Sequence, residues 1–395
     1  MSKIKTLVLI CLIFWGSNLN AQQKNDQNCF KTGADRPELY LPLLKNKTVG
    51  VVTNQTGLLG DRTHLVDFLV KNKIKIKTIF APEHGFRGNA DAGEHVKNGV
   101  DTKTGLPIIS LYGKNKKPYA KQLRGIDVIL FDIQDVGVRF YTYISTLTYV
   151  MEAAAENGVE VIVLDRPNPH DGYIDGPVLK KKWASFVGLH QVPVVYGLTI
   201  GEYGKMVNGE KWMKNGVQVK YTLIPMQDYH KKQRYGMLEK PSPNLPNNLA
   251  INLYPSLCFF EGTQVSVGRG TKYPFQIYGS PHIKNVMYYH FTPKPSYGAK
   301  NPFMSGKICY GENLTTYKER LMRLNLSWLI KAYKNYEHPN LGFFKKNLWI
   351  DKLAGTDQLR KQIIAGKSEK EIRDSWKQDL VEFQKIRAKY VIYQD

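Results

Sequence analysis

The first half of the chain alternates short apolar runs with segments of helical periodicity. Runs rich in β-branched and apolar residues predict strands at residues 49–53, 75–81, 107–111, 127–133, 159–164 and 217–224. Helical spacing of apolar side chains, or a capping box, predicts helices at 63–72, at 143–157 and from Thr199 onward. Because buried strands joined by helices form parallel sheets covered on both faces, the pattern predicts an α/β domain.

The predicted sheet is Rossmann-like, but the sequence lacks the glycine fingerprint of a nucleotide site. No G-x-G-x-x-G stands at a strand-to-helix turn, and Gly268-Arg269-Gly270 is too short to be one. We therefore expect no nucleotide, and no cofactor of any other kind is called for.

The pattern changes after about residue 240, where prolines and asparagines mark a loop at 241–248. Beyond Gly279, aromatic residues and short strand-like runs mix with helices, and Ser368 with Glu371 forms a capping box for a helix that reaches about Lys389. We expect a second, smaller α+β domain there. The predicted segments are a signal peptide at 1–21, a Rossmann-like catalytic domain at 35–262 and a C-terminal auxiliary domain at 263–395.

The N-terminus has the layout of a secretory signal peptide. Lys3 and Lys5 precede a short apolar stretch at 7–15, and cleavage is predicted before Gln22. The stretch is short for a mature membrane span, which favours a cleaved signal over the alternative, an uncleaved anchor. No later stretch is long and apolar enough to be a span. We therefore expect an exported protein, periplasmic or extracellular, with no membrane span once the signal is removed.

The chain is strongly basic, with a formal net charge of +22, which favours acidic partners. Its lysines are spread along the chain without a nucleic-acid-binding motif, so we expect a polyanionic polymer of the cell envelope rather than nucleic acid. Cys29, Cys258 and Cys309 remain after the signal, an odd number that argues against a disulfide scaffold and leaves a single bridge between Cys258 and Cys309 open. No CxxC occurs, so no structural zinc is expected.

Polar and charged residues follow several of the predicted strands at their carboxyl ends. In an open α/β sheet these ends share one edge, and ligands bind outside it. The sequence therefore predicts a polar cleft that carries carboxylates, built from Asn54, Glu83, His84, Arg87, Asp132, Asp135, Arg139, Asp165, Arg166 and Asn168.

Structural roles compete with functional ones at several of these positions. Asp132 or Asp165 could cap a following helix. Arg139 and Arg166 could hold the carboxylates in a buried network.

Glu83 and His84 have structural alternatives as well. Glu83 could pair with Arg87, and His84 could be a core histidine whose hydrogen bonds are satisfied. A metal site of Glu83, His84, Asp91 and His95 fits no familiar ligand spacing, so no metal is expected.

A cleft of this kind favours glycosidic or acyl hydrolysis. A glycosidase needs one carboxylic acid to protonate the leaving oxygen and a second group to stabilise or attack the anomeric carbon. Amides and aromatic rings would contact the sugar, and the candidates are Asn54, Asn168, Phe140, Tyr141 and Tyr143. Serine hydrolysis is less favoured because no G-x-S-x-G elbow occurs.

Several long motifs occur together along the chain. They are GVVTNQTG (50–57), FAPEHGFRG (80–88), FDIQDVGVRFYTYISTL (131–147), LDRPNP (164–169), YGLTIGE (196–202), PSPNLP (241–246) and YPSLCFFEGTQVSVGRGT (254–271). Together they resemble the exo-β-N-acetylmuramidases, from about Lys45 to the C-terminus. The resemblance implies a secreted two-domain hydrolase that removes N-acetylmuramic acid from the non-reducing end of peptidoglycan fragments.

The resemblance makes Glu83 the leading catalytic acid. His84, which follows it directly, is a further catalytic candidate from the strand-end pattern. Asp132 or Asp135 would orient the 2-acetamido group of the substrate, or one of them would be the nucleophile or the base for water. Glu261 would contact the sugar or have a structural role at the domain junction. A lactyl carboxylate on the sugar would be held by one of Arg87, Arg139, Arg166 and Arg269.

Two rival functions remain open on the sequence. One is a peptidoglycan-binding protein without activity. The other is an esterase or amidase that acts on the same polymer and releases acetate, lactate or peptide rather than free sugar.

Overall fold

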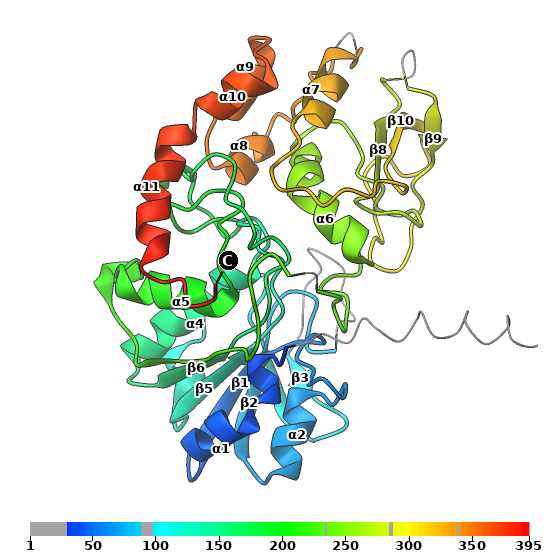
Figure 1. Cartoon of the computed structure of the whole chain (residues 1–395). Coiled ribbons are helices and arrows are strands. Elements are labelled where there is room, and N and C mark those ends of the chain that lie inside the picture. Colours follow the sequence, from blue (N-terminus) through cyan, green and yellow to red (C-terminus); the bar gives the residue numbers. More distant parts are fainter. Residues whose placement is uncertain (1–29, 88–97, 234, 284–286, 339, 395) are drawn as a thin grey trace, which may run out of the picture.

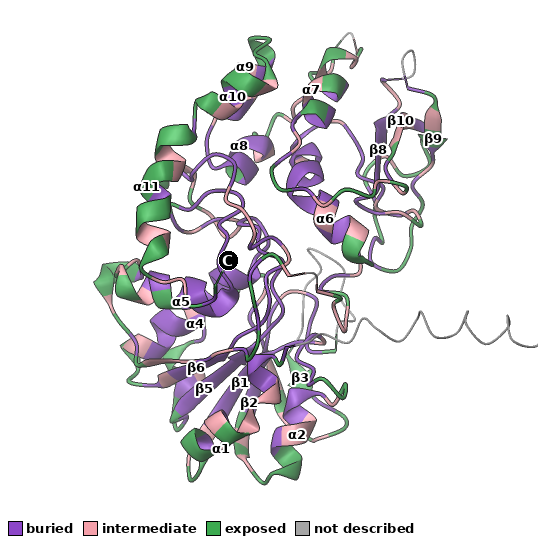
Figure 2. Ribbon diagram, in the orientation of Figure 1, coloured by how far each residue is buried: buried purple, intermediate pink, exposed green. Residues whose placement is uncertain are grey.

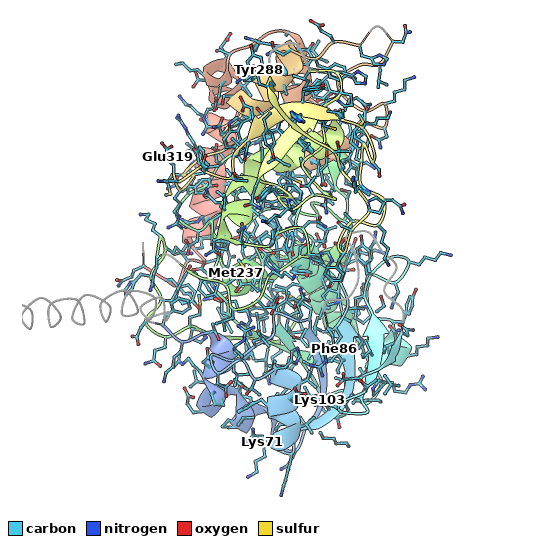
Figure 3. The ribbon with its side chains drawn as sticks, turned by 90° about the vertical axis from the view of Figure 1, so that its right-hand side faces the viewer. Lys71, Phe86, Lys103, Met237, Tyr288 and Glu319 are labelled. Atoms are coloured by element: carbon cyan, nitrogen blue, oxygen red, sulfur yellow. The ribbon has the colours of Figure 1, made fainter. Side chains whose placement is uncertain are left out.

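The computed structural model describes residues 30–87, 98–233, 235–283, 287–338 and 340–394. These residues form a sheet domain and a smaller C-terminal domain above it (Figure 1). A side view shows Phe86 at the level of the sheet and Tyr288 near the opposite end of the molecule (Figure 3). The predicted signal peptide lies outside the described residues.

Within the described residues, the sheet domain is built on a seven-stranded sheet in the order β3-β4-β2-β1-β5-β6-β7. Its strands are β1 (Thr48–Thr53), β2 (Lys75–Ala81), β3 (Gly99–Val100), β4 (Pro107–Ser110), β5 (Val128–Asp132), β6 (Glu160–Leu164) and β7 (Tyr221–Ile224). Neighbouring strands are parallel except β3 with β4. In chain order the parallel strands follow the 3-2-1-4-5-6 order of the Rossmann fold, which confirms the predicted fold class and puts the topological switch point between β1 and β5.

Alternate side chains of each strand face two different helical layers. Val49 and Val51 of β1 pack in one cluster with residues of α1 and α2, whereas Val52 and Phe131 pack in another with residues of α4 and α5. The central strands β1, β5 and β6 are therefore buried on both faces (Figure 2). The helices of this domain are α1 (Pro37–Leu44), α2 (Leu65–Lys71), α3 (Ala120–Leu123), α4 (Tyr143–Glu156) and α5 (Ile200–Gly209), with 3₁₀ turns η1 (Gly33–Asp35), η2 (Lys181–Trp183) and η3 (Lys214–Gly216).

The C-terminal domain is α+β, as predicted. A three-stranded antiparallel sheet in the order β8-β10-β9 packs beside helices. Its strands are β8 (Ile277–Ser280), β9 (Tyr289–Phe291) and β10 (Cys309–Asn313). Its helices are α6 (Asn248–Leu257), η4 (Cys258–Gly262), α7 (Ser327–Lys334), α8 (Trp349–Ala354), α9 (Gln358–Ile364), α10 (Glu369–Asp374) and α11 (Lys377–Ala388).

Two predictions for this domain differ from the structure. The single helix expected from Ser368 is wrong: α10 ends before Ser375, and the chain turns at Trp376, whose buried indole packs into the core, before α11 begins. The predicted loop at 241–248 leads into α6, which the sequence reading missed. Asn247 starts α6 by accepting a hydrogen bond from the amide of Ala250 at 2.9 Å.

The end of the chain returns to the sheet domain beside α5 (Figure 1). We call residues 390–394 the C-terminal clip. Within the clip, the Tyr393 hydroxyl donates to Asp165 at 2.7 Å, and the Ile392 amide donates to Glu202 at 2.8 Å. Glu202 also forms an ion pair with Lys231 at 2.6 Å, and both side chains are fully buried. The clip therefore supplies partners to charged groups inside the sheet domain.

Cys258 and Cys309 are both buried and free, so the bridge that the sequence left open does not form. Among the described residues, no helix is long and apolar enough to span a membrane.

Candidate active site

A cavity of about 570 Å³ lies between the two domains, outside the carboxyl ends of the sheet strands. The sheet domain contributes Glu83, His84, Tyr112, Gly113, Lys116, Phe140, Tyr141, Thr142, Ser185, Phe186, Val187, Ser242 and Leu245 to its lining. The C-terminal domain contributes Tyr254, Cys258, Glu261, Arg269, Phe275, Trp349, Lys352 and Leu353. Both domains are therefore needed to form the cavity.

Glu83 enters the cavity directly after β2. Pro82 restricts the backbone before it, and His84 and Gly85 follow with φ of 72° and 76°. A left-handed conformation costs a histidine free energy, and such strain is often found at functional sites. The carboxylate of the half-buried Glu83 accepts a hydrogen bond from the hydroxyl of Thr142 at 3.0 Å, which fixes its direction.

A second layer of polar groups supports the backbone of Glu83. Tyr143 is buried behind the cavity, with its hydroxyl 3.5 Å from the carbonyl oxygen of Glu83. That hydroxyl accepts a hydrogen bond from the side-chain amide of Asn54 at 2.8 Å. The carboxyl ends of β1 and β2 and the start of α4 are thus joined at Glu83, as the strand-end pattern predicted, although neither Asn54 nor Tyr143 is among the lining residues.

The C-terminal domain brings a second acid, Glu261, to the cavity. Its carboxylate accepts a hydrogen bond from Nε of Arg269 at 2.7 Å, and its backbone carbonyl accepts one from Lys345 at 2.9 Å. The guanidinium of Arg269 lies 5.0 Å from the ring centre of Phe275. Phe275 itself has a left-handed backbone with φ of 54°, so each wall of the cavity carries a strained non-glycine residue, Phe275 here and His84 in the sheet domain.

Aromatic rings and cations form much of the remaining lining. Phe186 stacks on Tyr149 with ring centres 6.1 Å apart, and Lys116 lies 4.6 Å from the centre of the Phe186 ring. Lys352 lies 5.8 Å from the centre of the Trp349 ring. With Lys116, Lys352 and Arg269 against Glu83 and Glu261, the lining carries one more cation than anions, and its flat rings suit the apolar faces of a sugar.

The structure places Asp132 and Arg166 outside this lining. Their side chains form a two-pronged ion pair at the ends of β5 and β6, and both are almost fully buried. Burial alone would lower the pKa of Arg166, but Asp132 raises it above its usual value. Arg166 also donates to the carbonyl of Leu58 at 2.9 Å. This is the buried network that the sequence offered as the alternative to direct substrate contact.

Asp165 takes the structural role that the sequence offered as an alternative, the capping of a following helix. Its carboxylate accepts hydrogen bonds from Thr199 at 2.7 Å and from the amide of Gly201 at 2.9 Å, so it caps the N-terminus of α5. Burial raises the pKa of Asp165 to about 6. Asn168 is buried too, donating to the carbonyl of Leu198 at 2.7 Å.

Two predicted arginines lie elsewhere. Arg87 holds both carboxylate oxygens of Asp101 at 3.0 Å outside the cavity. Arg139 is fully buried and donates to the carbonyls of Pro177, Val192 and Leu353 at 2.9, 2.6 and 3.0 Å. Burial lowers its pKa to about 9. Since Leu353 belongs to α8, Arg139 joins the two domains directly beside the cavity.

Of the site residues predicted from the sequence, the structure brings Glu83, His84, Glu261 and Arg269 to the cavity. The catalytic and binding roles given to all the predicted site residues stay predictions. Outside the cavity lining, every predicted site residue except Arg87 is buried, which favours supporting roles for them. Residues that the sequence reading missed include Thr142, Lys116, Phe186, Trp349 and Lys352. Thr142 stood inside a quoted motif, whereas the other four lie outside every one of the quoted motifs and gave no signal.

Metal binding finds no support among the residues described, which contain no group of three or more histidine, cysteine, aspartate or glutamate side chains suited to a metal. Asp91 and His95 of the rejected ligand set lie outside the described residues.

The fold and the cavity together define a two-domain α/β protein whose cavity is lined by a glutamate from each domain, the residue type on which glycoside hydrolases depend. Two family models match the chain, "Exo-beta-N-acetylmuramidase NamZ, N-terminal" at residues 49–249 and "Exo-beta-N-acetylmuramidase NamZ, C-terminal" at 252–393. The chain belongs to this family.

The two models meet inside α6, whereas the predicted domain boundary at 262 stays a prediction.

The chain is also similar to one curated protein and to two solved structures. The chain is 39% identical over 373 residues to the peptidoglycan beta-N-acetylmuramidase NamZ of Bacillus subtilis, which covers 90% of this chain and 89% of that protein. A crystal structure of a DUF1343 family protein from Bacteroides fragilis is 43% identical with a TM-score of 0.85, over 93% of this chain and 99% of that one. A second from the same organism is 29% identical with a TM-score of 0.78, over 92% and 99%.

The titration of Asp135 tests the buried polar groups of the sheet domain. Tyr196 and the amide of Gly137 donate to one of its oxygens, while burial raises its pKa to about 6. An unfolded chain releases this proton near pH 4, so the folded state binds the proton more tightly between about pH 4 and pH 6. The contribution of protonated Asp135 to the free energy of unfolding is therefore fully present below about pH 4, and it is lost as the pH rises to about 6.

We expect the free energy of unfolding of the wild type, relative to an Asp135→Asn variant, to fall by up to about 1.4 kcal/mol per pH unit over that window. Urea denaturation at several pH values between 4 and 7 measures the difference. Parallel pH curves for the two proteins would show that Asp135 does not titrate in this way.

Proposed function

We propose that this protein is an exo-acting glycoside hydrolase that releases N-acetylmuramic acid from the non-reducing end of peptidoglycan fragments. The observation that carries the proposal is the half-buried carboxyl of Glu83, held by Thr142 in a cavity that both domains enclose. The family and the Bacillus subtilis relative support the same bond and the same polymer. A peptidoglycan-binding protein or a cell-wall esterase or amidase is not favoured, because neither explains an acid fixed in this way.

Glu83 is the group placed to protonate the leaving glycosidic oxygen. General acid catalysis requires the acid to be positioned before the bond breaks, and the hydroxyl of Thr142 and the left-handed turn at His84 provide that positioning. Asp132 and Asp135 are buried and bonded within the sheet domain, so any effect they have on the reaction is indirect.

The function is tested with a matched pair of aryl glycosides. We expect the protein to release the aryl group from a β-N-acetylmuramide much faster than from a β-N-acetylglucosaminide, because the basic cavity suits the acidic sugar. Equal rates on the two would contradict the proposal. Release of acetate, lactate or peptide from intact peptidoglycan fragments without free sugar would identify the esterase or amidase, and absence of any product would identify a binding protein.

Glu83→Gln tests the acid. The variant keeps the size and the hydrogen bond to Thr142 but has no proton to donate, so kcat on the natural disaccharide should fall by about 10²- to 10⁴-fold. The loss should shrink on an aryl glycoside, whose leaving group barely needs protonation.

Glu382→Gln is the matched control, because Glu382 is an exposed acid on α11 and should leave both rates unchanged. A folded Glu83→Gln protein that cleaves the disaccharide at the wild-type rate would remove Glu83 from the mechanism.

We also propose that the protein is exported, because Lys3, Lys5 and the short apolar stretch after them have the layout of a signal peptide. The polymer proposed as substrate lies outside the cytoplasm, which supports the same destination. The intact mass of the protein recovered from the producing cell should correspond to a chain that begins near Gln22. A mass that retains Met1 would overturn the proposal.

A further inference from the structure

We propose that Arg269 binds the lactyl carboxylate of the muramic acid residue, and that the loop around it is built to hold its guanidinium in place. The inference rests on the proposed function, since it assigns the part of the cavity that recognises the acidic substituent. It makes Arg269 the residue that distinguishes N-acetylmuramic acid from N-acetylglucosamine.

Elimination narrows the choice among the four arginines that the sequence nominated. The guanidinium of Arg87 is occupied by Asp101 and lies outside the cavity. The guanidinium of Arg166 is bonded to Asp132 and to the carbonyl of Leu58. The guanidinium of Arg139 is bonded to three backbone carbonyls, and both arginine side chains are buried. Arg269 is the one of the four that lines the cavity.

The contacts of Arg269 orient its guanidinium without occupying all of it. Its side chain is 24% exposed, and its ion pair with Glu261 uses Nε. The ring of Phe275 supports the guanidinium at 5.0 Å. A guanidinium has five N–H donors, so one bond at Nε leaves the Nη groups for a two-pronged contact with a carboxylate. Glu261 in this arrangement is a positioning residue for Arg269.

The backbone on either side of Arg269 has a left-handed conformation that favours glycine, and a side chain has no room there. Gly268 and Gly270 have φ of 76° and 78°. A β-carbon at Gly268 would lie 2.5 Å from Ile277, and one at Gly270 would lie 2.5 Å from the carbonyl oxygen of Lys294. Gly268 and Gly270 therefore form a tight turn that presents Arg269 to the cavity. This role differs from the nucleotide fingerprint that the sequence already excluded.

The other cations of the lining are less suited to this contact. Lys116 and Lys352 rest on aromatic rings, and an ammonium is a point charge at the end of a flexible chain. Arginine matches the planar geometry of a carboxylate with two parallel hydrogen bonds, and its planar fork loses less side-chain entropy per bond. The cavity therefore has one rigid carboxylate-binding group, Arg269, and two lysines that add general positive potential.

The test compares two substrates that differ only in the lactyl group, an aryl β-N-acetylmuramide and the same glycoside with the carboxylate converted to a primary amide. For the wild type we expect kcat/KM to favour the acid by about 30-fold or more, the range for losing one partner of a charged hydrogen-bonded pair. In Arg269→Gln that preference should fall to within about 3-fold. Arg269→Lys should keep part of it, because the charge remains while the two-pronged geometry is lost.

Arg124→Gln is the matched control, because Arg124 is an exposed arginine outside the cavity lining and its replacement should leave the preference near its wild-type value. If Arg269 serves only to hold Glu261, its replacement will lower the rates on acid and amide in equal proportion, and the proposal fails. If Arg269→Gln does not fold, the acid-to-amide ratio of Arg269→Lys decides instead, and an unchanged ratio there also overturns the proposal.

A binding measurement separates this inference from the proposed function. Calorimetry with N-acetylmuramic acid and N-acetylglucosamine needs no hydrolysis. Tighter binding of the acid by the wild type, lost in Arg269→Gln, would support the carboxylate site even for a protein that cleaves nothing. A protein that cleaves the muramide but binds the two sugars equally well would retain the function and lose the site.

Discussion

The ion pair between Asp132 and Arg166 determines where this fold can bind a ligand. It lies at the carboxyl ends of β5 and β6 and also engages the carbonyl of Leu58 in the loop after β1. Those three segments surround the switch point between β1 and β5, where an open Rossmann sheet ordinarily takes its ligand. Here the charged pair occupies the crevice. Removing either partner would leave the other charge buried and unpaired, which destabilises a protein by about 3–5 kcal/mol. The ligand cavity is displaced outward, to the space between the domains.

That displacement explains why residues from both domains build the site. Glu83 extends beyond the filled crevice from the end of β2, supported from behind by Tyr143 and Asn54. The C-terminal domain encloses the other side with Glu261 and Arg269, and Arg139 joins it to the sheet domain through the carbonyl of Leu353. The buried polar groups fix the carboxyl edge of the sheet. Glu83 can therefore be positioned in the cavity without a shift of the strands.

The sequence predicted the sheet and its helices because buried parallel strands leave a strong apolar signal, and it located the functional edge because polar residues end those strands. The strand-end pattern alone could not separate Glu83 from Asp132, because an acid at a strand end looks the same in sequence whether or not a partner such as Arg166 lies beside it. Only the family resemblance favoured Glu83. Phe186 and Trp349 left no signal, since each is a single aromatic residue in an irregular stretch or at a helix start. The helix α6 was missed because Pro255 and several asparagines weaken its local preference, which tertiary packing overrides.

The C-terminal clip has a consequence for the order in which the molecule can be completed. Asp165 and Glu202 are fully buried in the sheet domain, yet Asp165 accepts a hydrogen bond from Tyr393 and Glu202 accepts one from Ile392. A ribosome makes the chain from the N-terminus, so the sheet domain is synthesised long before those partners exist. Asp165 and Glu202 lack these hydrogen bonds until the last residues emerge, so the sheet domain reaches its full stability only after synthesis of the whole chain has ended.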